Sequence, residues 1–356
     1  MNIEKDLWTH LRETKKPIVM YGMGNGADKI LRRFDEYGIK VDDFFASNGF
    51  VRGHSFHNKQ VLSLTEIEQK YKDFIIVLSF ASKLINVVDT FYNLNEKYEM
   101  YAPDVPVSGE GTFNLDFYNK NKDKFDRSRE LLADDLSVKV FDNVIKYKLT
   151  GKINYLKEIE TSHDEQWDTV LSPNKYEICV DAGAYNGDTA LEMLEKCKNI
   201  KKIYALEPDI RNYKKLCNTF INESRVIPYN AASWNKETTL EFNAEGNRNS
   251  NTFSTNPKKT IAVNAATIDS ICNNTADYIK YDVEGSEKNA LQGSVNTIKN
   301  CSPDLLVSVY HRNEDLFEIP LLINDMNPKY KLFLRKSVYV PAWDLNLYAI
   351  TPESAC

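Results

Sequence analysis

The chain has 356 residues, enough for about two domains of ~150 residues, and 42% of them are hydrophobic, which is ample for sizeable cores. The net charge is -6 and the lysines are dispersed among acids, which argues against a nucleic-acid partner. No run approaches the ~18 apolar residues of a membrane-spanning helix, and the N-terminus lacks the apolar core of a signal peptide. We therefore expect a cytoplasmic protein without a membrane partner.

The first part of the chain, residues 1–105, alternates between strand and helix patterns. Apolar runs predict strands at 17–21, 41–46 and 74–79, and helical spacing predicts helices at 28–37, 64–70 and 83–94. This alternation predicts a small α/β domain with an open parallel sheet.

A glycine-rich turn, Gly22–Ala27, follows the first strand and approximates the G-x-G-x-x-[GA] loop of dinucleotide-binding folds. The next strand ends in Ser47, where such folds place an acid for the ribose, and this weakens an NAD-type interpretation. The segment resembles the Rossmann-like nucleotide-sugar-binding segments that precede some sugar-modifying enzymes. The resemblance implies a nucleotide-sugar ligand, and the alternative is a structural or oligomerising role.

Residues 106–164 are predicted to form a helical connector. The preceding segment 103–111 holds two prolines and two glycines, which marks a boundary. Leu136, Val140, Val144 and Tyr147 share one helical face, and Gly151 fits a helix stop. The connector either covers the cofactor mouth of the next domain or acts as a spacer.

Residues 165–356 are predicted to form a second α/β domain. Its seven expected strands lie at 176–181, 203–207, 225–229, 278–282, 305–310, 331–336 and 345–350, and helices separate the first five. Ligands of such sheets lie at the carboxyl ends of the strands. The six cysteines of the chain include no C-x-x-C pair, so no zinc site is predicted and no metal ligand is assigned.

The stretch ICVDAGAYNGD, residues 178–188, is the predicted cofactor site. A buried strand ends at Asp181, and Gly183 and Gly187 permit a tight turn and a close approach of the main chain to a ligand. The turn opens onto a helix N-terminus, which favours a negative group. Glu207 ends the next strand about 20 residues further on, the usual place for a carboxylate that holds a ribose diol. This spacing suits either a dinucleotide or S-adenosylmethionine.

The residue types in these motifs favour S-adenosylmethionine. VDAGAYNGDTA followed by YALEPD resembles the class I methyltransferases, and two later stretches, YIKYDVEGSEKNALQG and LLVSVYHRNEDLFEIPLLI, resemble the FkbM-type methyltransferase family. The resemblance covers residues 175–350 and implies a seven-stranded Rossmann-like sheet whose last strands form a hairpin. It also implies cofactor contacts from Asp181, Gly183 and Gly187 at the methionine part, from Glu207 at the ribose, and from Asn230 and Ala231 at the adenine. Asp188 and Thr189 are further candidate cofactor contacts.

Asp282, Glu284 and His311 are the candidate catalytic residues. Methyl transfer to oxygen is an in-line displacement, so the protein must align two reactants and help a hydroxyl lose its proton. Asp282 and His311 end neighbouring strands of the expected sheet, and Glu284 follows Asp282 in the loop. The acids could bind a cation, position the methionine amino group or orient the hydroxyl, while Glu284 could instead cap the next helix. Histidine is the natural base near neutral pH, although a lone histidine is more often structural.

We therefore expect an S-adenosylmethionine-dependent O-methyltransferase that acts on a hydroxyl of a sugar, glycan precursor or other polyhydroxylated metabolite. The polar segment Asn243–Asn256 is predicted to be a surface loop that recognises the acceptor, and Trp343 would suit stacking on a sugar ring. The alternatives are a non-catalytic nucleotide-sugar-binding protein on a methyltransferase scaffold, and an NAD-type oxidoreductase that uses Gly22–Ala27. A divalent metal requirement and an oligomeric state stay open.

Overall fold

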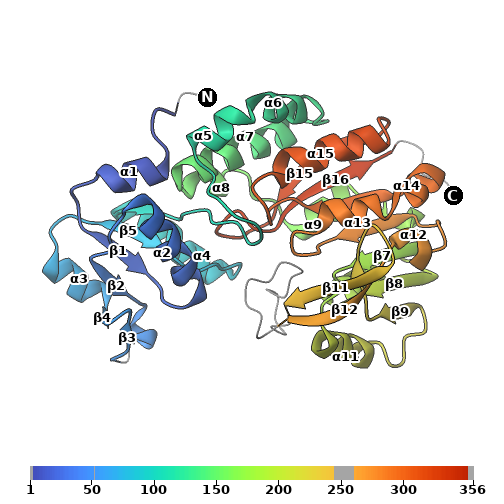
Figure 1. Cartoon of the computed structure of the whole chain (residues 1–356), viewed down its shortest axis with the longest axis horizontal. Helices are drawn as coiled ribbons and strands as arrows, with labels where there is room; N and C mark the ends of the chain where they lie inside the picture. The colour runs from blue at the N-terminus through green and yellow to red at the C-terminus, as the bar shows by residue number, and fades with distance from the viewer. Residues whose placement is uncertain (1–2, 52, 244–259, 352–356) are drawn as a thin grey trace.

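The computed structural model describes residues 3–51, 53–243 and 260–351. Their strands form a six-stranded, a three-stranded and a seven-stranded sheet. Figure 1 shows the six-stranded sheet, in blue, at the opposite end of the molecule from the sheet that contains the C-terminal strands. Among the described residues, no helix combines the length and the apolar character needed to cross a membrane.

The N-terminal part has the predicted parallel α/β arrangement, with strand order β3-β4-β2-β1-β5-β6 and only β3 antiparallel to its neighbour. The central strands β1 and β5 are buried along their whole length, as their apolar runs indicate. The short strands β3, β4 and β6 were not predicted. The elements are α1 (Leu7–Glu13), β1 (Ile18–Tyr21), α2 (Asn25–Tyr37), β2 (Asp43–Phe45), β3 (Ser55–Phe56), β4 (Lys59–Leu62), α3 (Leu64–Lys70), β5 (Ile75–Leu78), α4 (Ile85–Lys97) and β6 (Glu99–Tyr101).

The next segment is helical, as predicted, and contains α5 (Leu115–Lys120), α6 (Lys122–Glu130), α7 (Asp135–Thr150), α8 (Asn154–Lys157) and α9 (His163–Thr169). Asp134 caps the start of α7 by accepting the Ser137 N–H. Gly151 ends this helix in the left-handed conformation at a φ of 67°, which confirms the predicted stop. Val140, Val144 and Tyr147 are buried on the predicted face.

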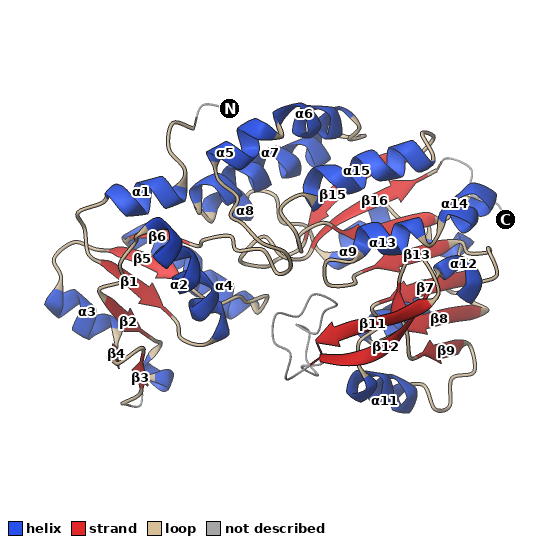
Figure 2. Cartoon of the chain, in the orientation of Figure 1, coloured by secondary structure: helices blue, strands red, loops and turns tan. Residues whose placement is uncertain are grey.

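The C-terminal part contains the seven predicted strands, with ends shifted by at most two residues. Their order, β15-β16-β14-β13-β7-β8-β9, places the antiparallel strand β16 between β14 and β15. Figure 2 shows β15 and β16 side by side. The carboxyl ends of β7, β8, β9, β13 and β14 consequently share one rim. The elements are β7 (Ile178–Ala182), α10 (Asp188–Lys196), β8 (Lys202–Leu206), α11 (Ile210–Thr219), β9 (Val226–Tyr229), α12 (Ile268–Ile271), β13 (Tyr278–Tyr281), α13 (Glu287–Gln292), α14 (Val295–Cys301), β14 (Asp304–Ser308), α15 (Asp315–Met326), β15 (Lys331–Lys336) and β16 (Leu345–Ile350).

A small sheet that was not predicted lies between β9 and α12. Strand β12 (Thr260–Ala266) pairs in parallel with β10 (Ala232–Ser233) and antiparallel with β11 (Thr238–Asn243). The predicted acceptor loop, Asn243–Asn256, lies outside the described residues except for its first residue, which ends β11.

Most of the segment that was predicted to be a boundary is packed: residues 103–108 are buried or half-buried, and residues 109–111 are exposed. Asp104 is buried and pairs with Lys148 of α7, and the Ala102 N–H donates to the Gly151 carbonyl at 2.8 Å. One apolar cluster includes Ile76 of the first sheet, Val144 of α7 and Val307 of the last sheet. The two large sheets are therefore joined by a continuous core.

Candidate active site

A cavity of about 260 Å³ opens at the carboxyl rim of the seven-stranded sheet. This is where ligands of open α/β sheets lie. Its lining includes seven of the predicted site residues, namely Gly183, Asp188, Thr189, Glu207, Ala231, Asp282 and Glu284. The other four, Asp181, Gly187, Asn230 and His311, lie behind the wall and hold or neighbour residues that form it.

The loop after β7 is shaped by its two glycines. Gly183 has a φ of 88°, and a Cβ at this position would lie 2.0 Å from the Asp282 carbonyl oxygen, so only glycine lets the loop approach the end of β13. Gly187 has a φ of 96°, and its Cβ would lie 2.4 Å from the Phe220 ring. Gly187 therefore seats the loop against the end of α11, while Gly183 faces the cavity.

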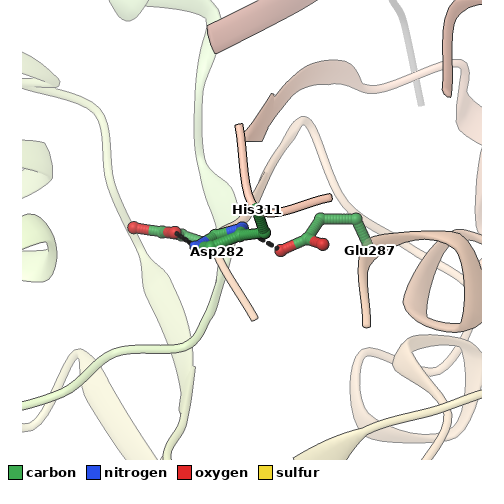
Figure 3. Close-up of side chains that lie close together, drawn as sticks. All are labelled: Asp282, Glu287 and His311. Carbon is green, nitrogen blue, oxygen red and sulfur yellow. Dashed lines mark ion pairs between the residues drawn. The ribbon is translucent and has the colours of Figure 1, made fainter. Parts of the chain in front are cut away.

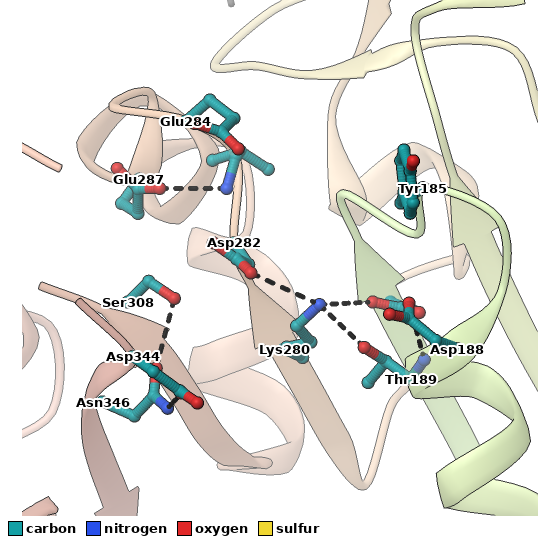
Figure 4. Close-up of polar contacts among 12 residues, drawn as sticks. Tyr185, Asp188, Thr189, Lys280, Asp282, Glu284, Glu287, Ser308, Asp344 and Asn346 are labelled. Atoms are coloured by element: carbon teal, nitrogen blue, oxygen red, sulfur yellow. Dashed lines mark hydrogen bonds and ion pairs between the residues drawn. The ribbon is translucent and has the colours of Figure 1, made fainter. Parts of the chain in front are cut away.

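Beneath this loop lies a buried charge pair that involves Lys280, a residue that sequence reasoning missed. Its Nζ is 3.3 Å from Asp181 Oδ1, 3.0 Å from Thr189 Oγ1 and 3.8 Å from Asp282 Oδ2 (Figure 4). Burial acts to lower the pKa of Lys280, but Asp181 and Asp282 outweigh it and raise this pKa, so the ammonium keeps its proton. The available signal was a lysine inside a strand buried on both faces, where a charge requires a partner.

Glu207 lies in the cavity wall at the end of β8. Its Oε2 accepts the Tyr185 N–H and its Oε1 accepts the Asp209 N–H, both at 2.9 Å, which fixes the carboxylate and leaves further lone pairs for a ligand. Burial raises the pKa of Glu207 to about 7, although these two N–H groups act to lower it. Asn230 donates its side-chain amide to the carbonyls of Glu207 and Pro208, so it braces this wall rather than lining it. Its predicted adenine contact stays a prediction.

His311 lies behind the cavity wall, fully buried between carboxylates. Its Nε2 is 3.5 Å from Asp282 Oδ1 and 3.6 Å from Glu284 Oε2, while its Nδ1 is 2.9 Å from Glu287 Oε1. Figure 3 shows the imidazole between the side chains of Asp282 and Glu287. Glu287 Oε1 also accepts the N–H groups of Val283 and Gly285, so it is Glu287 rather than Glu284 that binds the main chain ahead of α13.

These neighbours decide the charge of the imidazole. Burial acts to lower the pKa of His311, but Glu287, Glu284 and Asp282 outweigh it and raise the pKa to about 10. Burial also raises the pKa of Glu284 to about 8, against the opposing effect of His311. This pKa leaves His311 protonated at neutral pH, so the imidazole cannot accept a proton. The predicted base role therefore requires that something else neutralise the carboxylates.

The family model of the methyltransferase FkbM domain matches residues 181–331. We refer to these residues, 181–331, as the FkbM domain. It contains the glycine loop, Lys280, Glu207 and the carboxylates around His311. The fold class predicted from the sequence is confirmed.

Solved structures extend the likeness in fold beyond this domain. The methyltransferase FkbM from Methylobacillus flagellatus KT has a TM-score of 0.75 with 20% sequence identity, over 96% of this chain and 92% of that chain. An rRNA methylase from Streptococcus thermophilus matches with a TM-score of 0.33 and 10% identity, over 50% of this chain and 87% of that one. The N-methyltransferase NodS from Bradyrhizobium japonicum WM9 matches with a TM-score of 0.33 and 13% identity, over 54% and 94%. No curated protein was found to match the chain.

Parts of the chain outside the FkbM domain complete the cavity. Helix α9 contributes His163 and Trp167, and Lys83 and Val107 come from the N-terminal part and the segment after it. The nearby Ser108 N–H donates to the His311 carbonyl at 2.9 Å. Of the two roles predicted for the helical connector, its contribution to the cavity wall favours the covering role.

Strained backbone gathers around the cavity. Tyr185, Glu284 and Asp344 are non-glycine residues in the left-handed region, with φ values of 48°, 53° and 56°, and all three line it. The left-handed conformation of each non-glycine residue costs about 1–2 kcal/mol of folding free energy. Such strained residues are common at functional sites, where the backbone must hold a side chain in a set direction. Aromatic side chains on the same wall include Tyr339 and Trp343, whose ring centroids are 5.6 Å apart.

Proposed function

We propose that the chain is an S-adenosylmethionine-dependent O-methyltransferase whose acceptor is a hydroxyl of a sugar, a glycan precursor or another polyhydroxylated metabolite. The observation that carries the proposal is that one cavity of the FkbM domain brings the glycine loop, Lys280, Glu207 and Asp282 together at the strand ends. Six carboxyl side chains line this cavity, which suits a ligand with a positive sulfonium group: Asp188, Glu192, Glu207, Asp282, Glu284 and Asp344.

The residues of the wall fit the parts of this cofactor. The Lys280 ammonium would pair with the methionine carboxylate, since its Nζ lies beside Thr189 at the start of α10. Glu207 would accept hydrogen bonds from the ribose diol, because its main-chain contacts already hold the carboxylate in place. Ala231 and Pro208 leave an apolar surface for the adenine ring.

The acceptor would enter from the side of Asp282 and Glu284. When bound, S-adenosylmethionine supplies an electrophilic methyl group. An acceptor hydroxyl would displace the sulfur from this methyl group, and a carboxylate of the wall would take the hydroxyl proton. Asp282, whose Oδ2 is 3.8 Å from Lys280 Nζ, is placed for this role. Tyr339 and Trp343 would stack on an apolar sugar face, and Lys83 at the same cavity would attract an anionic acceptor such as a nucleotide sugar.

The test is a mass-spectrometric screen of sugars, nucleotide sugars and other polyhydroxylated compounds with S-adenosylmethionine that carries a labelled methyl group. We expect one acceptor class to gain one labelled methyl group, and Gly183→Val to abolish the gain because its side chain would collide with Asp282. Tight binding of S-adenosylhomocysteine without transfer to any acceptor would contradict the proposal and favour the non-catalytic scaffold.

A further inference from the structure

The side chains around His311 have an arrangement that methyl transfer alone does not require. The ligand-type atoms of Asp282, Glu287 and His311 all lie within 4.8 Å of one another, and Glu284 Oε2 is 3.6 Å from the same histidine. His311 is fully buried, and its Nε2 has no hydrogen-bond partner among the described residues. A buried imidazole normally has such a partner, so its absence points to a missing ligand.

The two ring nitrogens have different surroundings. On the Nδ1 side, Glu287 Oε1 already accepts two main-chain N–H groups and lies 2.9 Å from the ring, so it fixes the orientation of the imidazole. A carboxylate beyond the far nitrogen of a histidine is the usual support of a metal-binding histidine. The Nε2 side, in contrast, faces the cavity residues Asp282 and Glu284.

We propose that Asp282, Glu284 and His311 bind a divalent cation through Oδ1, Oε2 and Nε2, with Glu287 as the residue that positions the imidazole. Ligand atoms at about 2.0–2.2 Å from one metal are separated by about 3 Å from their neighbours. The distances of 3.5 and 3.6 Å from Nε2 to the two carboxylate oxygens are longer than this, so both carboxylates must move towards the imidazole and towards each other when the ion binds. Two carboxylates with one imidazole suit Mn²⁺ or Mg²⁺, and the nitrogen ligand favours Mn²⁺.

Another histidine, His163 in the cavity wall, serves as a control. His163 also lies between two carboxylates, but Asp344 is 3.0 Å from its Nε2 and Glu192 is 3.6 Å from its Nδ1. Because the two carboxylates face opposite nitrogens, they cannot share one cation with this ring. His163 should therefore contribute nothing to cation binding.

The cation would have a role in catalysis, and this role rests on the proposed function. Asp282 and Glu284 line the cavity, so a cation between them would present its remaining coordination positions to the acceptor. A hydroxyl bound to a divalent cation loses its proton more readily, so the cation would activate the acceptor oxygen.

The test measures Mn²⁺ binding to the full-length chain with neither cofactor nor acceptor present. Binding is monitored through the loss of the free-ion signal in electron paramagnetic resonance. We expect one site per chain in the wild type, at least tenfold weaker binding in His311→Gln and in Glu284→Gln, and unchanged binding in His163→Gln. Circular dichroism checks that each variant is folded, and Glu284→Gln, at the cavity surface, keeps the test valid if His311→Gln does not fold.

Three outcomes would overturn the proposal. The first is the lack of a saturable Mn²⁺ site in the wild type, and the second is an equal loss of Mn²⁺ affinity in His163→Gln. The third is full Mn²⁺ binding in Glu284→Gln with a loss of affinity only in Glu287→Gln, which would place the cation on the Nδ1 side of His311. Because the assay contains no substrate, Mn²⁺ binding without methyl transfer would leave this site intact and count only against the proposed function.

Discussion

At the scale of single residues, the candidate site contains buried charges that water cannot screen. Asp181 is fully buried, and the Lys280 ammonium is the cation that compensates it. Removing one partner of a buried pair leaves an uncompensated charge, which typically costs about 3–5 kcal/mol. The pair is thus expected to support both the fold and the cofactor cavity.

We predict that Lys280→Met destabilises the protein by about 3–5 kcal/mol and that the double variant Lys280→Met with Asp181→Asn recovers much of this loss, because no charge is then stranded. Urea unfolding of the wild type, both single variants and the double variant measures the coupling. Additive losses would show that the two side chains do not interact.

A second residue-scale prediction concerns pH. Burial raises the pKa of Glu207 to about 7. Only the ionised carboxylate can accept from both ribose hydroxyls, and protons compete with the ligand below this pKa. The affinity for S-adenosylhomocysteine should therefore fall, by up to about tenfold per pH unit, as the pH drops from about 7 towards 5. Calorimetric titrations across this range should show a flat profile for Glu207→Gln; the same slope in that variant would assign the pH dependence to another group.

At the scale of elements, Gly183 in the loop between β7 and α10 has both a left-handed backbone and a close contact with the end of β13. We predict that Gly183→Ala destabilises the protein by several kcal/mol, because the new Cβ meets both a left-handed backbone and the Asp282 carbonyl oxygen. Gly38 is the matched control, since it is also left-handed, with a φ of 68°, but has no atom within 4 Å of an added Cβ. Gly38→Ala should cost only about 1–2 kcal/mol. Equal midpoints of thermal unfolding for the two variants would refute the close-approach argument.

The elements that were predictable from sequence are those with local signals. The strand that ends at Asp181, the glycine turn after it and the helix stop at Gly151 each follow from a few adjacent residues. The contacts of Lys280 were not predictable in this way, because they join β13 to β7 and α10 across the sheet. The role of Asn230 depends likewise on which carbonyls the fold brings to its amide. The small sheet of β10, β11 and β12 has short strands whose pairing depends on their neighbours.

At the scale of the whole molecule, one apolar core joins the N-terminal sheet to the FkbM domain. Trp8 donates its indole N–H to the Phe113 carbonyl at 3.3 Å, Ser82 and Val340 exchange two main-chain hydrogen bonds, and the buried pair Lys148–Asp104 ties α7 to the segment after β6. Two independent domains would bury less at this junction.

We therefore predict that the full chain unfolds in a single cooperative transition in differential scanning calorimetry, and that S-adenosylhomocysteine shifts the whole transition upwards. Lys148→Met should lower the same transition without splitting it, because the variant strands Asp104 inside the shared core. Two resolved transitions, with the ligand moving only one, would show that the parts fold separately.

The most direct test of the central claim, that the cavity at the strand ends binds S-adenosylmethionine through Glu207, is calorimetric titration of S-adenosylhomocysteine into three proteins. The account predicts saturable binding to the wild type and, in Glu207→Ala, a loss of about 1.5–3 kcal/mol, which is about 10- to 150-fold in affinity. Asp304→Asn is the control, because Asp304 is also buried but lies at the start of β14, away from the cavity lining. Undiminished binding in Glu207→Ala, or an equal loss in Asp304→Asn, would contradict the account.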